Sequence, residues 1–178
     1  MPPAGPEPAP RIYSVGHSTR TFDELVELLV ASGVRQLADV RSFPGSRRHP
    51  HFARGHLEAA LPASGIAYRW MPGLGGRRRL GAGPSPNTAW RVAGFRAYAD
   101  YMATEEFRAA CAELERWARA APTAFMCAEA RYRMCHRQLL ADALVARGWE
   151  VVHLETLKRA EPHVLTSFGC VAADGSVT

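Results

Sequence analysis

Lysine is almost missing from this sequence of 178 residues. Among its 22 basic residues, Lys158 is the only lysine and the rest are arginines. Such a bias, together with many alanines and glycines, is typical of a GC-rich coding sequence, so the number of arginines alone says little about function. The net charge of +5 still favours anionic partners. Where the arginines cluster is therefore more informative than how many there are.

Long apolar runs and export signals are also missing. No run approaches the roughly 20 apolar residues that a membrane-spanning helix needs, so we expect no membrane contact. The opening MPPAGPEPAP has neither the basic nor the apolar part of a secretion signal. We expect residues 1–10 to form a flexible, proline-rich tail on a cytoplasmic protein. In that compartment the four cysteines are expected to be thiols rather than disulfides.

Short apolar segments alternate with segments of helical spacing along the rest of the chain. The pattern predicts strands over residues 11–17, 34–42, 66–74, 123–129 and 150–155, and helices over 21–33, 56–65, 89–103, 104–120 and 133–147. Such alternation is typical of an α/β fold. We therefore predict a single domain over residues 11–155, with a mainly parallel open sheet of about five strands flanked by helices. Residues 156–178 are expected to form a C-terminal extension that packs on the domain or trails from it.

Polar residues follow four of the expected strands. They are His17 after the first, Asp39, Arg41, Ser46 and Arg47 at and after the second, Gly73, Gly75, Gly76 and Arg77 after the third, and Cys127 and Glu129 after the fourth. Parallel strands end at the same edge of a sheet, where open α/β sheets bind ligands. We therefore expect these residues to converge on one cleft.

The stretch between the fourth strand and the next helix carries the most unusual residues. It contains Cys127, Glu129, Cys135, His136 and Arg137. A helix N-terminus lowers a thiol pKa and holds anions, so we expect Cys135 to have the lower pKa of the two cysteines. Glu129 is expected to orient His136 or Arg137. The competing interpretation is that both cysteines are packed in the core, as free cysteines commonly are.

Two chemical alternatives fit this stretch poorly. Cys127 and Arg133 have the Cys-x5-Arg spacing of a phosphatase loop, but the intervening AEARY has no glycine, and Glu129 would repel a dianion. A redox pair of Cys127 and Cys135 lacks the usual C-x-x-C spacing. Neither pattern is therefore preferred.

A zinc site is a third alternative, and its ligands would be Cys127, Cys135, His136 and the distant His17. The sequence has neither the C-x2-C nor the H-x3-H spacing that is typical of zinc sites, and adjacent Cys and His are awkward ligands. We therefore expect no metal here, and the sequence identifies no cofactor. The glycines at 73, 75 and 76 also lack the spacing of a dinucleotide-binding loop.

Three ordered motifs resemble a known family. They are Gly16-His17-Ser18, then Asp39-Val40-Arg41 with Pro44 and Ser46, and finally Cys127-x-Glu129 with Cys135-His136-Arg137. Together they resemble the domain of unknown function 488 family over about residues 12–155. The resemblance implies a common fold and a common set of residues, and it implies no reaction.

These observations favour an enzyme that acts on an anionic substrate, such as a nucleotide, a nucleic acid or another phosphate-bearing molecule. The nucleophile candidates are Cys135 and Cys127; the acid or base candidates are His17, Asp39 and Glu129; and the substrate-binding candidates are Arg41, Ser46, Arg47, His136 and Arg137. The alternative is a non-catalytic nucleic-acid-binding module, in which basic loops grip the backbone and the Cys-Glu-Cys-His-Arg cluster is structural. The sequence leaves open whether the protein is an enzyme and what its oligomeric state is.

Overall fold

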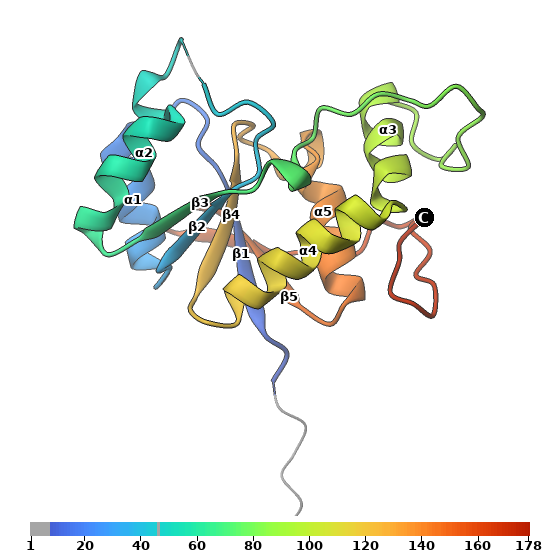
Figure 1. Cartoon of the computed structure of the whole chain (residues 1–178). Coiled ribbons are helices and arrows are strands. Elements are labelled where there is room, and N and C mark those ends of the chain that lie inside the picture. The colour runs from blue at the N-terminus through green and yellow to red at the C-terminus, as the bar shows by residue number, and fades with distance from the viewer. Residues whose placement is uncertain (1–7, 46) are drawn as a thin grey trace, which may run out of the picture.

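One sheet organises the computed structural model, which describes residues 8–45 and 47–178. Among these residues the sheet has six strands in the order β3-β2-β4-β1-β5-β6. Their bounds are β1 Arg11–Gly16, β2 Gln36–Asp39, β3 Ala67–Trp70, β4 Thr123–Cys127, β5 Glu150–Thr156 and β6 Arg159–Pro162. The first five are parallel, and β6 alone runs antiparallel, beside β5. The predicted α/β fold with a mainly parallel open sheet is confirmed (Figure 1).

The sixth strand lies in the expected C-terminal extension. Its sequence, RAEP, has no apolar alternation, so the sequence pattern did not reveal it. Pairing with the edge of β5 instead supplies its backbone hydrogen bonds. Most of the tail predicted over residues 1–10 lies outside the described residues.

Helices cover both faces of the sheet. The helices are α1 Phe22–Ala31, α2 Arg54–Ala60, α3 Ala93–Met102, α4 Glu105–Ala118 and α5 Arg137–Ala146. One apolar core packs α1 and α2 against one face, and a second packs α3, α4 and α5 against the other (Figure 1). In the described part of the chain, none of these helices has the length and apolar character needed to cross a bilayer.

The residues at which α1 and α5 begin determine where the neighbouring polar residues lie. α1 begins as predicted, with Thr21 and Glu24 forming a reciprocal capping box. The helix predicted over 133–147 begins later, because Tyr132–Met134 form a separate 3₁₀ turn and α5 starts at Arg137. Cys135 therefore has an extended backbone and precedes the helix rather than opening it.

The strand order creates a crevice beside β1. The chain leaves β1 through α1 toward β2, and it leaves β4 through α5 toward β5, which lies in the opposite direction along the sheet. Ligands of open α/β sheets bind at such a reversal. Backbone hydrogen bonds join the two loops there: His17 N donates to Cys127 O at 2.9 Å and Ser18 N to Ala128 O at 2.9 Å. The two motifs are thus adjacent in space.

Candidate functional site

A cleft of about 320 Å³ opens at this edge of the sheet. Its polar lining is Arg41, Ser42, Arg77, Cys127, Glu129, Cys135 and His136, and its apolar lining includes Phe43, Val92, Phe95 and Met134. Five of the predicted site residues therefore reach one cleft. His17, Asp39 and Arg137 are buried beside it and do not line it.

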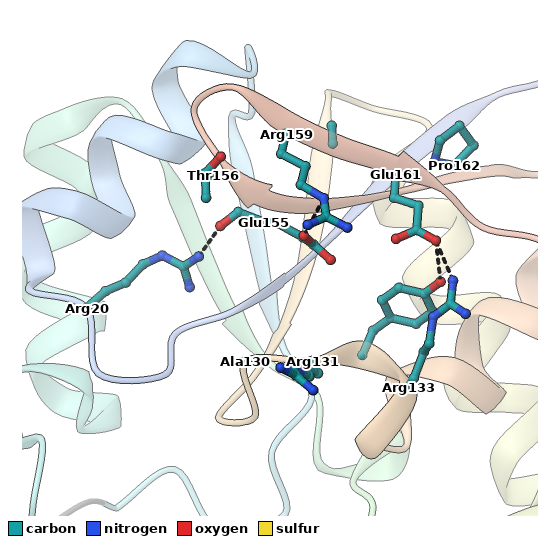
Figure 2. Close-up of a pocket in the computed structure, with 11 residues that line it drawn as sticks. Arg20, Ala130, Arg131, Arg133, Glu155, Thr156, Arg159, Glu161 and Pro162 are labelled. Carbon is teal, nitrogen blue, oxygen red and sulfur yellow. Dashed lines mark hydrogen bonds and ion pairs between the residues drawn. The ribbon is translucent and has the colours of Figure 1, made fainter.

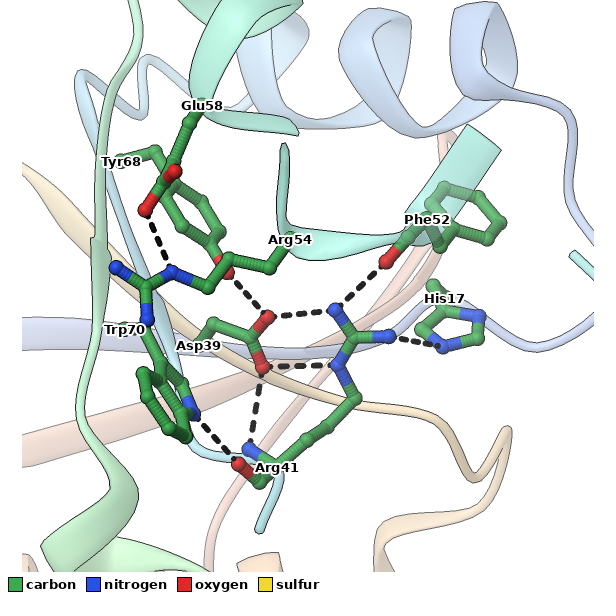
Figure 3. A network of polar contacts seen from close by, with 8 residues as sticks. All are labelled: His17, Asp39, Arg41, Phe52, Arg54, Glu58, Tyr68 and Trp70. Atoms are coloured by element: carbon green, nitrogen blue, oxygen red, sulfur yellow. Dashed lines mark hydrogen bonds and ion pairs between the residues drawn. The ribbon is translucent and has the colours of Figure 1, made fainter. Parts of the chain in front are cut away.

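Asp39 and Arg41 form a buried ion pair. Residues two apart at a strand end share one face, and here the two side chains meet: Nε and Nη2 of Arg41 donate to the carboxylate at 2.8 and 2.6 Å. Tyr68 donates its hydroxyl to Asp39 at 2.6 Å, and Arg41 also donates to the carbonyl of Phe52 at 2.8 Å (Figure 3). The Asp39 carboxylate is thus fully occupied. Its contacts hold the guanidinium of Arg41 in place, and its role as an acid or base stays a prediction.

Both ring nitrogens of His17 have hydrogen-bond partners. Its Nε2 lies 3.2 Å from Nη1 of Arg41, which is always a donor, so Nε2 must accept and the proton resides on Nδ1. Nδ1 in turn faces the carbonyl of Ser18 at 3.0 Å. Burial against the ring of Phe52 lowers the pKa of His17 to about 4. A neutral His17 therefore holds Arg41 in place.

Cys127, Cys135 and His136 form a compact cluster on the floor of the cleft. Nδ1 of His136 lies 3.6 Å from Sγ of Cys135 and 3.9 Å from Sγ of Cys127. Nε2 of His136 lies 3.0 Å from the carbonyl oxygen of Val40, to which it must donate. In the neutral imidazole the unprotonated Nδ1 therefore faces both thiols.

The pKa values of the two thiols are shifted in opposite directions. A hydrogen bond from Cys127, followed by the contact with His136, lowers the pKa of Cys135. The same hydrogen bond and burial raise the pKa of Cys127. The order matches the one expected from the sequence, but its cause differs, since Cys135 precedes α5 and the neighbouring side chains supply the effect.

Arg137 is buried and holds the loop under the cleft. Its side chain is 1 % exposed, and it donates to the hydroxyl of Ser14 and to the backbone carbonyls of Glu129 and Ala130. Glu129 meets Arg137 through its backbone, so the expected orienting role of its carboxylate is not seen. The exposed carboxylate belongs to the rim of the cleft.

Two glycines that the motif analysis left without a role shape the cluster. A Cβ atom on Gly76 would lie 2.4 Å from Nδ1 of His136, so only glycine leaves room for the ring. A Cβ on Gly16 would lie 1.9 Å from the carbonyl oxygen of Glu129. The glycine-rich run after β3 was the available sequence signal, but its partner in the fold could not be read from it.

The other predicted anion-binding residues contribute unevenly. Ser46 lies outside the described residues, and Arg47 and Arg48 are exposed and do not line the cleft. Arg78 folds back to donate to three carbonyl oxygens of its own loop. Arg77 alone of the 77–79 triplet reaches the cleft.

A larger pocket of about 730 Å³ lies between residues 130–133 and the β5–β6 hairpin (Figure 2). Three of its arginines already have ion-pair or hydrogen-bond partners within the protein. Arg133 pairs with Glu161, Arg159 pairs with Glu155, and Arg20 donates to two backbone carbonyls. No thiol lines it. The smaller cleft, which is lined by Cys127, Cys135 and His136, is therefore the better candidate site.

Comparison with protein families matches residues 21–144, more than half of the chain, to the family described as Domain of unknown function DUF488. The chain belongs to this family. The DUF488 match covers the motifs around Asp39 and Cys127 on which the resemblance was based, and the Gly16 motif precedes it. Neither a curated protein nor a solved structure matched the chain. DUF488 membership names no reaction, so the chemistry follows from the geometry of the cleft.

Proposed function

We propose that this protein is a cytoplasmic enzyme that acts on a small anionic substrate by covalent thiol catalysis. The observation that carries the proposal is the contact of Cys135 with the bare Nδ1 of His136 at the floor of a cleft. Nucleophilic thiols in enzymes are activated by just such a neighbouring base. The volume of about 320 Å³ fits a small molecule rather than a polymer.

Each residue of the cluster has a role in this proposal. His136 takes the proton of Cys135, and the sulfur then forms a bond to the electrophilic atom of the substrate. The leaving group departs with the proton held by His136, and water releases the product and restores the thiol. Cys127 donates its S–H to the sulfur of Cys135 and stabilises the thiolate.

Charge in the cleft selects the substrate. Arg77 on the rim and Arg41 on the wall attract an anion, and Arg41 is held by Asp39 and His17 with one N–H of Nη1 unused by its described partners. The carboxylate of Glu129 repels a substrate that carries a high negative charge. A singly charged substrate suits this balance better than a dianion.

Two alkylating probes of matched size test both parts of the proposal. Iodoacetate and iodoacetamide, applied to the folded protein with site assignment by mass spectrometry, should both modify Cys135 faster than the exposed Cys170. An attraction of about 1 kcal/mol between the cleft and the anion predicts about a fivefold preference for iodoacetate at Cys135 relative to Cys170. The buried Cys111, whose pKa is raised to about 12 by burial, should stay unmodified.

Single substitutions distinguish the effect of charge in the cleft on alkylation from the effect of the neighbouring base. Arg77→Gln should reduce the preference for iodoacetate, whereas Arg79→Gln, an exposed neighbour outside the cleft, should leave it unchanged. His136→Gln should slow modification of Cys135 and not of Cys170. An unreactive Cys135 in the folded protein, or equal probe preference at both cysteines, would overturn the proposal and favour a structural cluster in a binding module.

A further inference from the structure

The cluster in the cleft also has the donor set of a soft metal site. Sγ of Cys127, Sγ of Cys135 and Nδ1 of His136 all lie within 4.8 Å of one another, and all three residues are buried. Thiolate sulfur and imidazole nitrogen are the ligands that zinc prefers. The three atoms come from one short stretch of chain, which Arg137 folds back on itself by binding the carbonyls of Glu129 and Ala130.

The distances match tetrahedral coordination. With Zn–S of about 2.3 Å and Zn–N of about 2.0 Å, a tetrahedral ion places its nitrogen and sulfur ligands about 3.5 Å apart. The corresponding separations from Nδ1 of His136 are 3.6 Å to Cys135 and 3.9 Å to Cys127. Both separations are close to this value, so binding an ion requires little movement of the nitrogen relative to either sulfur.

The surroundings of His136 also suit a metal ligand. A metal-bound imidazole commonly donates its other N–H to a carbonyl or carboxylate, which fixes the ring and its tautomer. Here Nε2 faces the carbonyl oxygen of Val40 at 3.0 Å, so Nδ1 is left without a proton and directed at the thiols. Gly76 lies against the ring and limits its rotation.

We propose that Cys127, Cys135 and His136 bind one zinc-class divalent cation, with the fourth coordination position open to the cleft. On binding, each thiol releases one proton, so two thiolates, a neutral imidazole and the dication form a neutral group that can remain buried. The regulatory consequence of this binding rests on the proposed function, because the same sulfur of Cys135 is the nucleophile. The sulfur of Cys135 is either bound to the cation or available as a thiol. A bound cation therefore prevents Cys135 from acting as the nucleophile.

Cobalt binding tests the site independently of any activity. The reduced, chelator-treated full-length protein is titrated with Co²⁺, and a tetrahedral site with thiolates should give a thiolate-to-cobalt charge-transfer band and intense visible bands that saturate at one ion per chain. Zn²⁺ should abolish both. Cys127→Ser, Cys135→Ser and His136→Gln should each lose the bands, and Cys111→Ser and Cys170→Ser should keep them. Circular dichroism identifies any variant that fails to fold.

The result that overturns the metal site is the absence of charge-transfer bands, or bands that survive in all three ligand variants while these stay folded. Alkylation by iodoacetamide distinguishes this failure from that of the proposed function. If Cys135 reacts in the metal-free protein but cobalt gives no bands, the nucleophile stands and the metal site fails. If cobalt binds but metal-free Cys135 is inert, the metal site stands without its switching role and the thiol enzyme fails. If both hold, Zn²⁺ should protect Cys127 and Cys135 from iodoacetamide and leave Cys170 reactive.

Discussion

Asp39→Asn keeps the size of a buried side chain and removes its charge, which leaves the guanidinium of Arg41 without its counter-ion. The Asp39 side chain is fully buried and that of Arg41 is 6 % exposed. The carboxylate accepts three hydrogen bonds from Arg41 and one from Tyr68. Removing one partner of such a pair costs about 3–5 kcal/mol, a large share of the roughly 5–15 kcal/mol that stabilises a domain.

Urea unfolding followed by tryptophan fluorescence measures this loss. With an m-value of about 2 kcal/mol/M, the midpoint should fall by about 2 M in Asp39→Asn. Glu58→Gln is the control, because the Arg54–Glu58 pair lies in the same region with its side chains 46 % and 44 % exposed. Exposed pairs contribute up to about 1 kcal/mol, so its midpoint should shift by about 0.5 M or less.

A double-mutant cycle identifies the origin of the loss. Arg41→Gln combined with Asp39→Asn removes the stranded charge, so the double variant should be less destabilised than the sum of the two single variants. Additive losses, or an Asp39→Asn midpoint no lower than that of Glu58→Gln, would refute the reasoning that a buried ion pair supports this loop.

Two further predictions concern the cluster and acid stability. Gly76→Ala should displace the ring of His136 and slow alkylation of the cleft thiol, whereas Gly81→Ala, where a Cβ meets nothing within 4 Å, should not; equal rates in both variants would contradict the packing argument. Burial lowers the pKa of His17 from 6.5 to about 4 and that of His153 from 6.5 to about 2. Below pH 6.5 the unfolded chain therefore binds more protons than the folded chain. The free energy of unfolding should decrease as the pH is lowered through this range, by up to about 1.4 kcal/mol per pH unit for each histidine. The urea midpoint between about pH 7 and pH 5 measures this, His17→Gln should flatten the slope, and a constant midpoint would show that neither histidine is kept neutral by the fold.

The parallel sheet could be predicted because its central strand is buried along its whole length. TAFMC in β4 is apolar apart from Thr123, and such strands alternate with amphipathic helices. β6 has no such signature, because an exposed edge strand is stabilised by backbone pairing and needs no apolar face. The late start of α5 at Arg137 was equally hidden, since Tyr132–Met134 form a 3₁₀ turn whose sequence also suits a helix.

The convergence of the site could be predicted, but the division of roles within it could not. Strand ends determine which loops meet, and this placed Arg41, Cys127 and Cys135 near one cleft. Which histidine directs an unprotonated nitrogen at the thiols depends on the hydrogen bonds of its ring, and these come from residues far away in the sequence. Nε2 of His17 accepts a hydrogen bond from Arg41. Nε2 of His136 instead donates to the carbonyl of Val40, which leaves Nδ1 of His136 without a proton. Such contacts exist only in the folded chain.

Val40 links the two halves of the site through the geometry of one strand end. Side chains alternate along a strand, so Asp39 and Arg41 face the α1–α2 side while Val40 packs in the core on the α3–α5 side. The amide of Val40 donates to Met126 on β4, and its carbonyl accepts from Nε2 of His136. Asp39 and Arg41 flank Val40 in the sequence, so the residues of the buried ion pair stand directly beside the carbonyl that accepts from His136. One strand end thus supplies the side chains of the ion pair and, through its backbone, the hydrogen bond that leaves Nδ1 of His136 directed at the two thiols.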